Sequence, residues 1–356
     1  SLLQERRCTL HARIVDAIER LYPDRLAEQV ERLAHHALRG EIWEKALVYV
    51  RQAGAKAFGR SAYREAVAWF DQALAALKHL PESRDTIEQA IDLRFDLRNS
   101  LAPLGEFRRI LDYLREAETP AEILDDRRRL SRISSMMALC LTMIGDHDRA
   151  VESGQRALAI ATALGDFGLQ VTANNYLGQA HLALGDYRRA IDFLRRNVAS
   201  LEGDLTREYF GLAAPPSVMS RTWLVRCLSE LGEFDEGIAR GEEAVRIAEA
   251  VDQPFIFFFA YWGLGQLYLC KGEFHKAIPV LEGALGLACP RSLACAPGTG
   301  TPGVCPPASR RDPLASRAFG CREGRGLLPS GHGAGPRTRD APAPSPLPLR
   351  LGHAVF

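Results

Sequence analysis

The chain has 356 residues, 47% of them hydrophobic and 25% charged, which is ordinary for a protein with a sizeable core. The formal net charge of +1 gives no reason to expect nucleic acid or an anionic membrane as a partner, because both need a concentrated basic face. The charge is unevenly spread, however. Residues 289–356 carry nine Arg, no Lys and three acidic residues, so two different kinds of sequence have been joined.

The first residues form a helical pattern. Apolar residues recur every three or four positions from Leu2 to Leu21, and Pro23 ends this predicted helix. The segment lacks the apolar centre of a signal peptide, and because the chain begins with Ser1 we expect that it was cut from something longer. A second helix is predicted over Asp24–Leu38.

Eight cysteines are present, but their spacing favours neither a disulfide framework nor a metal site. Four lie far apart in helical stretches, where a single Cys usually behaves as a small buried hydrophobe. The four in the last part of the chain include no C-x-x-C pair. We therefore expect a reducing, cytoplasmic compartment and no structural zinc.

One small or aliphatic position recurs along most of the chain. Aligned copies give intervals of 44, 40, 40, 47 and 40 residues. The aligned residues are Ala66, Ile110, Ala150, Ala190, Gly237 and Ala277. From the second copy onward a Gly-acid pair precedes each of them, at residues 105–106, 145–146, 185–186, 232–233 and 272–273. Gly closes one helix in a left-handed conformation and the acid favours the start of the next, so the pattern predicts an array of helix hairpins.

The clearest copy is residues 174–197. Leu177, Gly178 and His181 follow an L-G-x-x-Y spacing, and Ala190 and Leu194 occupy the matching small and bulky positions after the turn. This copy resembles a tetratricopeptide repeat. The 40-residue interval exceeds the usual length of about 34 residues and reaches the range of HEAT and armadillo repeats, but the Gly-acid turn favours a longer tetratricopeptide variant. We predict an all-α fold, a right-handed α-solenoid of tetratricopeptide-like hairpins over residues 41–288.

Three other segments complete this organisation. The 47-residue interval contains Pro215-Pro216, so residues 202–217 are predicted to be a loop or shortened turn. The apolar run Phe255–Cys270 is shorter than the roughly 20 residues that span a bilayer, and we expect a buried repeat helix there. Residues 289–356 hold 12 of the 20 Pro and 10 of the 30 Gly, which predicts a disordered tail. Its composition also fits GC-rich DNA read in the wrong frame, so a frameshift artefact is a hypothesis for it.

No motif supports an active site. No P-loop is present, and the Gly-rich stretch at residues 295–303 lacks the required Lys. His35-His36 lacks the H-E-x-x-H spacing, and the acidic pairs Asp125-Asp126 and Glu242-Glu243 are typical of solvated helix faces. We expect no catalytic residue, no metal and no cofactor.

The remaining candidate is the inner face that stacked hairpins create. In each first helix, the positions three before, one after and four after the repeat's Gly share one stripe. The resemblance to tetratricopeptide folds implies that this stripe lines a concave groove. The stripe comprises Ser135, Leu139, Thr142, Asn175, Gln179, Leu182, Thr222, Arg226, Ser229, Trp262, Gln266 and Leu269. Within it, the predicted partner-binding residues are Asn175, Gln179, Thr222, Arg226, Trp262 and Gln266. The lysine-rich carboxylate clamp of chaperone-binding members is absent from the stripe.

The beginning of the chain has a narrower resemblance. Glu31–His36 (ERLAHH) and Lys45–Ala57 (KALVYVRQAGAKA) resemble the junction in bacterial signalling proteins that join a class III adenylate or guanylate cyclase, an AAA/STAND-type ATPase and a tetratricopeptide array. This resemblance implies that residues 1–40 are a helical junction after missing ATPase and winged-helix parts. The chain itself has no cyclase metal-binding aspartates and no Walker motif, so the parent's activity is not expected in it.

Two hypotheses follow from these patterns. In the first, the chain is a non-enzymatic sensor segment of such a cyclase–ATPase, whose groove binds a peptide, a protein or upstream domains of the same parent chain. In the second, it is an independent cytoplasmic scaffold or transcription-regulator fragment. Neither hypothesis includes nucleic acid or a membrane as a partner.

Overall fold

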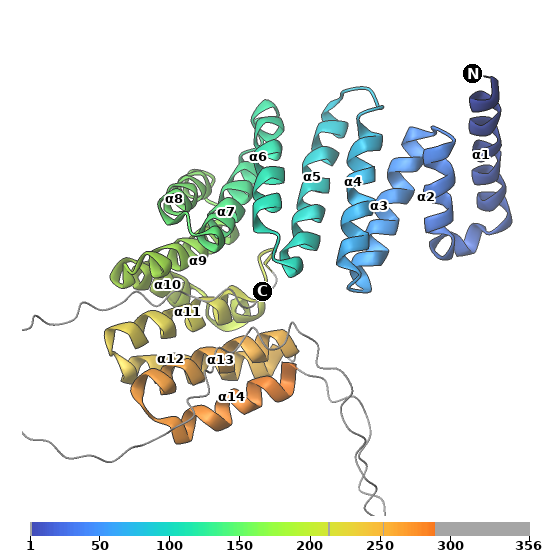
Figure 1. Ribbon diagram of the computed structural model, residues 1–356. Coiled ribbons are helices and arrows are strands. Elements are labelled where there is room, and N and C mark those ends of the chain that lie inside the picture. Colours follow the sequence, from blue (N-terminus) through green and yellow to red (C-terminus); the bar gives the residue numbers. More distant parts are fainter. Residues whose placement is uncertain (1, 213, 252, 289–356) are drawn as a thin grey trace, which may run out of the picture. The chain divides into compact units, whose positions relative to one another are not determined.

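The computed structural model describes residues 2–212, 214–251 and 253–288, and this part of the chain consists of α-helices, short 3₁₀ helices and connecting turns (Figure 1). The first helices are α1 (Leu2–Leu21), η1 (Pro23–Glu28), α2 (Val30–Arg39), α3 (Trp43–Gly59), α4 (Tyr63–Leu77), α5 (Arg84–Leu101), η2 (Ala102–Leu104) and α6 (Phe107–Ile123). They are followed by α7 (Arg127–Ile144), α8 (His147–Ala163), α9 (Phe167–Leu184), α10 (Tyr187–Ser200), η3 (Gly203–Arg207), α11 (Pro216–Leu231), α12 (Phe234–Val251), α13 (Pro254–Lys271) and α14 (Phe274–Ala288).

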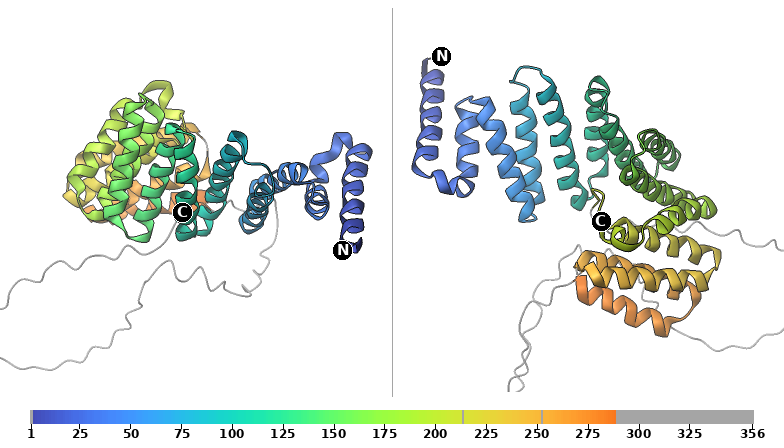
Figure 2. Two further views of the ribbon diagram at one scale, coloured as in Figure 1. Left: turned by 90° about the horizontal axis from the view of Figure 1, so that it is seen from above. Right: turned by 180° about the vertical axis from the view of Figure 1, so that it is seen from behind.

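Each α-helix packs against the next, which confirms the predicted α-solenoid of helix hairpins (Figures 1 and 2). The five Gly-acid turns are the left-handed turns that the sequence predicts. Their glycines have φ between 70° and 95°. They are Gly105, Gly145, Gly185, Gly232 and Gly272. A side chain at such an angle is strained, so Gly at these places lets a two-residue connection reverse the chain.

The acid of the turn does not act in the same way in every copy. The Asp186 carboxylate accepts a hydrogen bond from the Arg189 backbone N–H at 3.3 Å and so caps α10. Asp146 makes no such cap and pairs instead with the Arg149 side chain at 3.3 Å. Glu106 makes none either, because its longer carboxylate reaches the Arg109 guanidinium at 2.9 Å. A negative charge near a helix N-terminus is favourable in all three copies.

The aligned repeat position is buried in every hairpin. Its six residues lie on the second helices α4, α6, α8, α10, α12 and α14. Where the residue is Ala or Gly, its small size lets the first helix of the hairpin approach the second one closely. Gly178 on α9 has the complementary role, because a Cβ there would lie 2.6 Å from a methyl carbon of Leu194 on α10. Close contact of this kind between backbone and side chain fixes the spacing of a hairpin.

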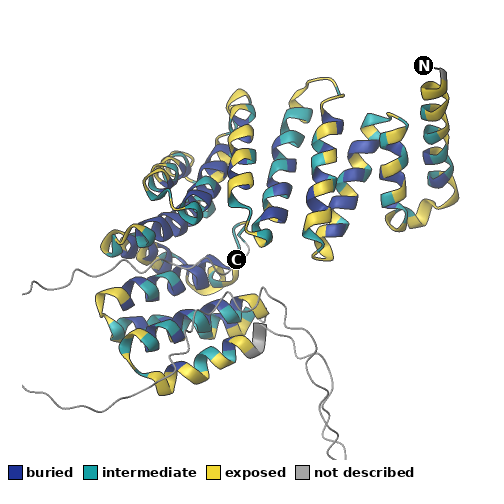
Figure 3. Ribbon diagram, in the orientation of Figure 1, coloured by how far each residue is buried: buried dark blue, intermediate teal, exposed yellow. Residues whose placement is uncertain are grey.

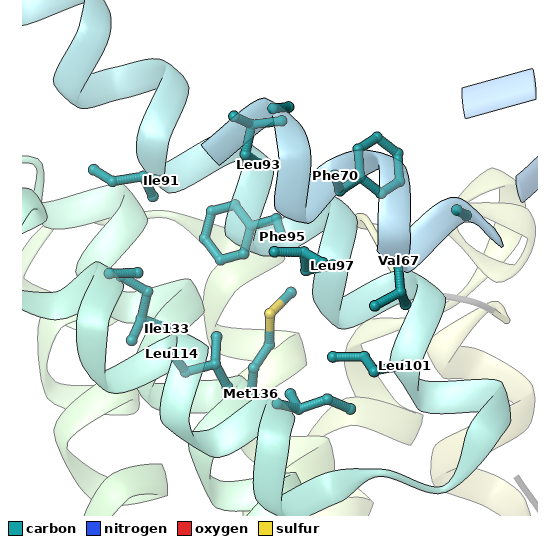
Figure 4. Packing of buried hydrophobic residues seen from close by; sticks show 14 of the residues in the cluster. Val67, Phe70, Ile91, Leu93, Phe95, Leu97, Leu101, Leu114, Ile133 and Met136 are labelled. Atoms are coloured by element: carbon teal, nitrogen blue, oxygen red, sulfur yellow. The ribbon is translucent and has the colours of Figure 1, made fainter. Parts of the chain in front are cut away.

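The largest core cluster runs from α2 to α9, with its centre around α5. Ile91, Leu93, Phe95 and Leu97 are buried at every second position, which places them on two sides of α5, against α4 and against α6. Figure 4 shows Phe95 and Leu97 from this helix close to Met136 of α7. The buried positions form continuous bands along the helices, while the hairpin ends are exposed (Figure 3).

One predicted helix differs in the structure, and the predicted tail lies outside the described residues. The predicted helix over Asp24–Leu38 begins as the 3₁₀ helix η1 and becomes α2 only at Val30, because the backbone of Arg25 leaves helical geometry. The predicted disordered tail, residues 289–356, lies outside the described residues. Within the described residues no helix is both long and apolar enough to cross a membrane.

Candidate functional site

Four first helices in succession carry the predicted partner-binding residues and their stripe. α7 contacts α9, α9 contacts α11, and α11 contacts α13, so these helices follow one another along one side of the hairpins. Asn175 and Gln179 on α9 and Thr222 on α11 are buried, with exposed fractions of 0%, 5% and 1%. The other three predicted residues, Arg226, Trp262 and Gln266, are half-buried.

The buried residues of the stripe hold polar atoms that have no partner. The Asn175 Nδ2, Gln179 Nε2, Thr222 Oγ1 and Ser135 Oγ atoms are enclosed and make no hydrogen bond within the described structure. A buried polar group left in this state costs about 1–3 kcal/mol, and native proteins contain few of them. These four atoms come from three successive first helices, α7, α9 and α11. We call these four side chains the polar row.

A hydrogen-bond network fixes the orientation of Asn175. Asn197 on α10 donates to the Val171 carbonyl at 2.8 Å and to the Ser220 hydroxyl at 3.1 Å. The Ser220 hydroxyl in turn donates to Asn175 Oδ1 at 3.4 Å. The carbonyl side of the Asn175 amide is therefore occupied, and its NH₂ group remains as a spare donor.

An aromatic group continues the site on α11 and α13. The Arg226 guanidinium lies 5.1 Å from the centre of the Trp262 ring, within cation–π distance. The Trp262 ring is stacked on Phe259 at 5.8 Å and meets Trp223 edge-on at 6.0 Å. The structure thus brings together two predicted residues, Arg226 and Trp262, and adds two aromatic rings that the stripe does not contain. The Trp223 Nε1 atom is also buried without a partner.

The chemistry available at this face is binding by hydrogen bonds and stacking. His181 on α9 stacks on Phe193 at 5.6 Å, and burial lowers the pKa of its imidazole, which favours the neutral ring. Burial raises the pKa of the Cys140 and Cys227 thiols to about 12, so neither is a reactive thiolate. Among the described residues, no cluster of three or more His, Cys, Asp or Glu side chains could hold a metal ion.

Sequence reasoning missed several contributors to the site. Asn197 and Ser220 lie outside the stripe, and only their position on otherwise apolar helix faces distinguishes them as buried polar residues. From the sequence alone, Trp223 and Phe259 are indistinguishable from ordinary core residues, because nothing in their spacing predicts that α11 and α13 bring their rings together. Gln266 lies on the same helix as Trp262, and no hydrogen bond of its side chain appears within the described structure.

Comparison with known proteins fits this architecture. Residues 125–202, which include α7, α8, α9 and α10, match the family model described as tetratricopeptide repeat. The chain therefore contains a tetratricopeptide repeat region. Tetratricopeptide repeat protein 29 of Trypanosoma brucei brucei is 28% identical over 137 residues, which is 38% of this chain. The matched region spans only 27% of that relative's length.

Solved structures share the fold. The BtubC (BKLC) protein from P. vanneervenii superposes with a TM-score of 0.54 at 19% identity, covering 68% of this chain and 98% of BtubC. The Rap conjugation gene regulator of the plasmid pLS20, solved in complex with the Phr* peptide, superposes with a TM-score of 0.51 at 16% identity. That match covers 71% of this chain and 75% of the regulator. At these identities the likeness concerns the fold alone.

Proposed function

We propose that the face formed by α7, α9, α11 and α13 binds an extended segment of a partner protein, which makes the chain a non-enzymatic interaction module. The polar row carries this proposal. Its amide groups are donors, and the groups that an extended peptide offers in regular order are carbonyl acceptors. These atoms are enclosed in the free chain, so a bound segment would reach them by displacing the side chains that cover them. The hydrogen bonds gained by atoms that have no partner in the chain alone would favour the complex.

The spacing of the helices supports an extended ligand. Packed helices lie about 8–10 Å apart, and an extended chain rises about 3.3 Å per residue. One repeat therefore corresponds to about three residues of a peptide that crosses the helices. Asn175 on α9 and Thr222 on α11 would then contact the peptide about three residues apart, and the aromatic rings of α11 and α13 would receive an apolar side chain.

The Rap regulator, a protein of similar fold that was solved with a bound peptide, adds support. The narrower setting, a sensor arm of a cyclase–ATPase, rests on the resemblance at Glu31–His36 and Lys45–Ala57. The coding sequence upstream of Ser1 tests it. An in-frame cyclase domain and P-loop would support the sensor arm, whereas a start codon a few codons upstream would favour an independent scaffold.

Peptide display on the full chain tests the binding proposal itself. A random peptide library is selected on the wild-type protein, and the affinity of each enriched synthetic peptide is then measured for the wild type and for the double variant Asn175→Ala, Gln179→Ala. Loss of two hydrogen-bond donors should weaken binding at least about tenfold. Circular dichroism checks that the variant keeps its helices.

The matched control is Gln155→Ala, which removes an amide from the exposed face of α8. This variant should bind the selected peptides as the wild type does. The proposal is wrong if the enriched peptides bind the double variant and the wild type equally well, or if the library yields no peptide that binds.

A further inference from the structure

A pocket that shares no residue with the polar row lies beside the insertion that lengthens one repeat. Its volume is about 350 Å³, and its walls come from the end of α10, from η3, from the start of α11 and from the second half of α12. The residues that matter for its chemistry are Glu202, Arg207, Arg221, Glu243 and Arg246. We propose that this pocket is a binding site for a small oxyanion, either a phosphate or a carboxylate group.

The walls of the pocket are held in place. The Ser217 hydroxyl on α11 donates to the Thr206 carbonyl at 2.5 Å, which anchors η3 to that helix. The Leu201 side chain, at the start of the insertion, is fully buried. Gly203 has φ of 57°, a left-handed conformation that turns the chain into η3 at little steric cost. The insertion is thus a fixed wall of the pocket.

The innermost charge of the pocket is Arg221, whose side chain is only 2% exposed. It donates to the Ser217 carbonyl at 3.0 Å and to Glu243 at 2.9 Å, while its Nε atom is buried without a partner. A guanidinium has five N–H donors in a rigid fork, and a free one among them is suited to an oxygen acceptor. A buried cation with an unused donor is the feature that an anionic ligand would satisfy.

The carboxylates of the wall do not neutralise the pocket. Arg221 and Arg240 hold the two oxygens of Glu243, at 2.9 Å and 3.1 Å, and these contacts lower the pKa of that carboxyl. Arg207 and Arg246 are exposed and form no ion pair with any other described residue. The only other acid of the wall is Glu202. Three arginines against two carboxylates leave the pocket with a positive charge, and each guanidinium can bind an oxyanion in bidentate fashion.

Titration calorimetry of the full chain with inorganic phosphate, and separately with succinate, tests the site. Each anion is compared with sodium chloride at equal ionic strength. Arg207→Gln and Arg246→Gln should each weaken binding about tenfold, and the double variant should abolish it. Both residues are exposed and unpaired, so these changes leave the fold intact. Arg188→Gln, which removes an exposed and unpaired charge from α10, is the control and should bind as the wild type does.

The relative affinities identify the source of the oxyanion. Tighter binding of phosphate assigns a phosphate group, and tighter binding of succinate assigns a carboxylate. The proposal is overturned if neither anion binds the wild type more tightly than chloride does, or if the Arg207→Gln, Arg246→Gln double variant binds them as the wild type does.

Discussion

The first helices of the hairpins before residue 125 and those after it are connected in different ways. In the first region, long charged side chains bridge alternate helices. Lys45 on α3 pairs with Glu19 on α1 at 2.8 Å, and Arg51 on α3 pairs with Asp96 on α5 at 3.3 Å. In the second region the alternate helices α7 and α9, α9 and α11, and α11 and α13 touch directly. The bridging charges of the first region are paired with each other, whereas the polar row of the second region has donors without a partner.

The sizes of the side chains explain this difference. α5 presents Phe95 and Leu97 to its neighbours, and large side chains of this kind increase the distance between helix axes. α13 has Gly263 where it faces α11, and a Cβ there would lie 2.5 Å from the Thr222 methyl carbon. Small residues bring first helices together, and this close packing encloses the polar groups on them. This difference in packing supports the proposal that the second region is the ligand-binding part of the chain.

The largest expected change in the free energy of unfolding comes from a substitution in the first region. Leu97→Ala should destabilise the protein by about 2–5 kcal/mol, because it leaves a cavity in place of a fully buried side chain. Chemical denaturation measures the loss, and hydrogen exchange locates it. Since repeats contact mainly their neighbours, exchange should accelerate in α4, α5 and α6 and remain unchanged in α13. Equal acceleration in α13 would show that the two regions unfold as one unit.

A smaller loss is expected where the second region is tightest. Gly263→Ala should destabilise the protein by about 1–3 kcal/mol, because the new methyl group meets short, β-branched Thr222, which cannot move aside. Gly59→Ala at the end of α3 is the control. Open space surrounds that glycine, so a gain of about 0.5–1 kcal/mol is expected. Thermal denaturation measures the stability of both variants. If both substitutions stabilise the protein, or both destabilise it, the explanation is contradicted.

Replacement of a polar-row residue should separate stability from binding. Gln179→Met keeps most of the side-chain volume and removes a buried donor that has no partner, so the free chain should gain about 1 kcal/mol. The same variant should bind the selected peptides more weakly. A loss of stability in denaturant titrations would mean that Gln179 is already satisfied in the free protein.

The smallest effect is a pH dependence at α1. His11 Nδ1 and His36 Nδ1 are 2.8 Å apart, so one ring must accept the proton that the other donates. Burial lowers the pKa of both, with further lowering by His35 and by nearby Arg7, Arg32 and Arg39. The unfolded chain therefore binds these protons more tightly. Stability is constant above the unfolded value of 6.5 and falls as the pH decreases below it.

Hydrogen exchange at about pH 7 and about pH 5 checks this dependence, with faster exchange of α1 expected at the lower pH. α1 packs mainly on α2 and η1 and is joined to α3 by the Lys45–Glu19 ion pair, so the loosening should stay within these first helices. The double variant His11→Gln, His36→Gln should lose the difference between the two pH values. If it keeps the difference, other groups cause the dependence.

The sequence reveals the local features of the fold and few of the tertiary ones. The Gly-acid turns are predictable because a left-handed Gly is a property of one or two residues. The 3₁₀ geometry of η1 is not, since Asp24–Leu38 has an uninterrupted helical pattern. The stripe predicts which residues share a helix face, but the burial of Asn175 and Thr222 depends on how closely neighbouring repeats approach. The oxyanion pocket combines arginines from three separate elements, and no spacing along the chain relates Arg207 to Arg246.

The most direct test of the central claim is a hydrogen-exchange footprint of a selected peptide on the full chain. If the second region is the binding part, protection should appear in α7, α9, α11 and α13, around the polar row and the rings of Trp223, Phe259 and Trp262. α1, α3 and α5, whose bridging charges are paired with each other, should exchange as in the free protein. Protection confined to α1, α3 and α5 would contradict the account.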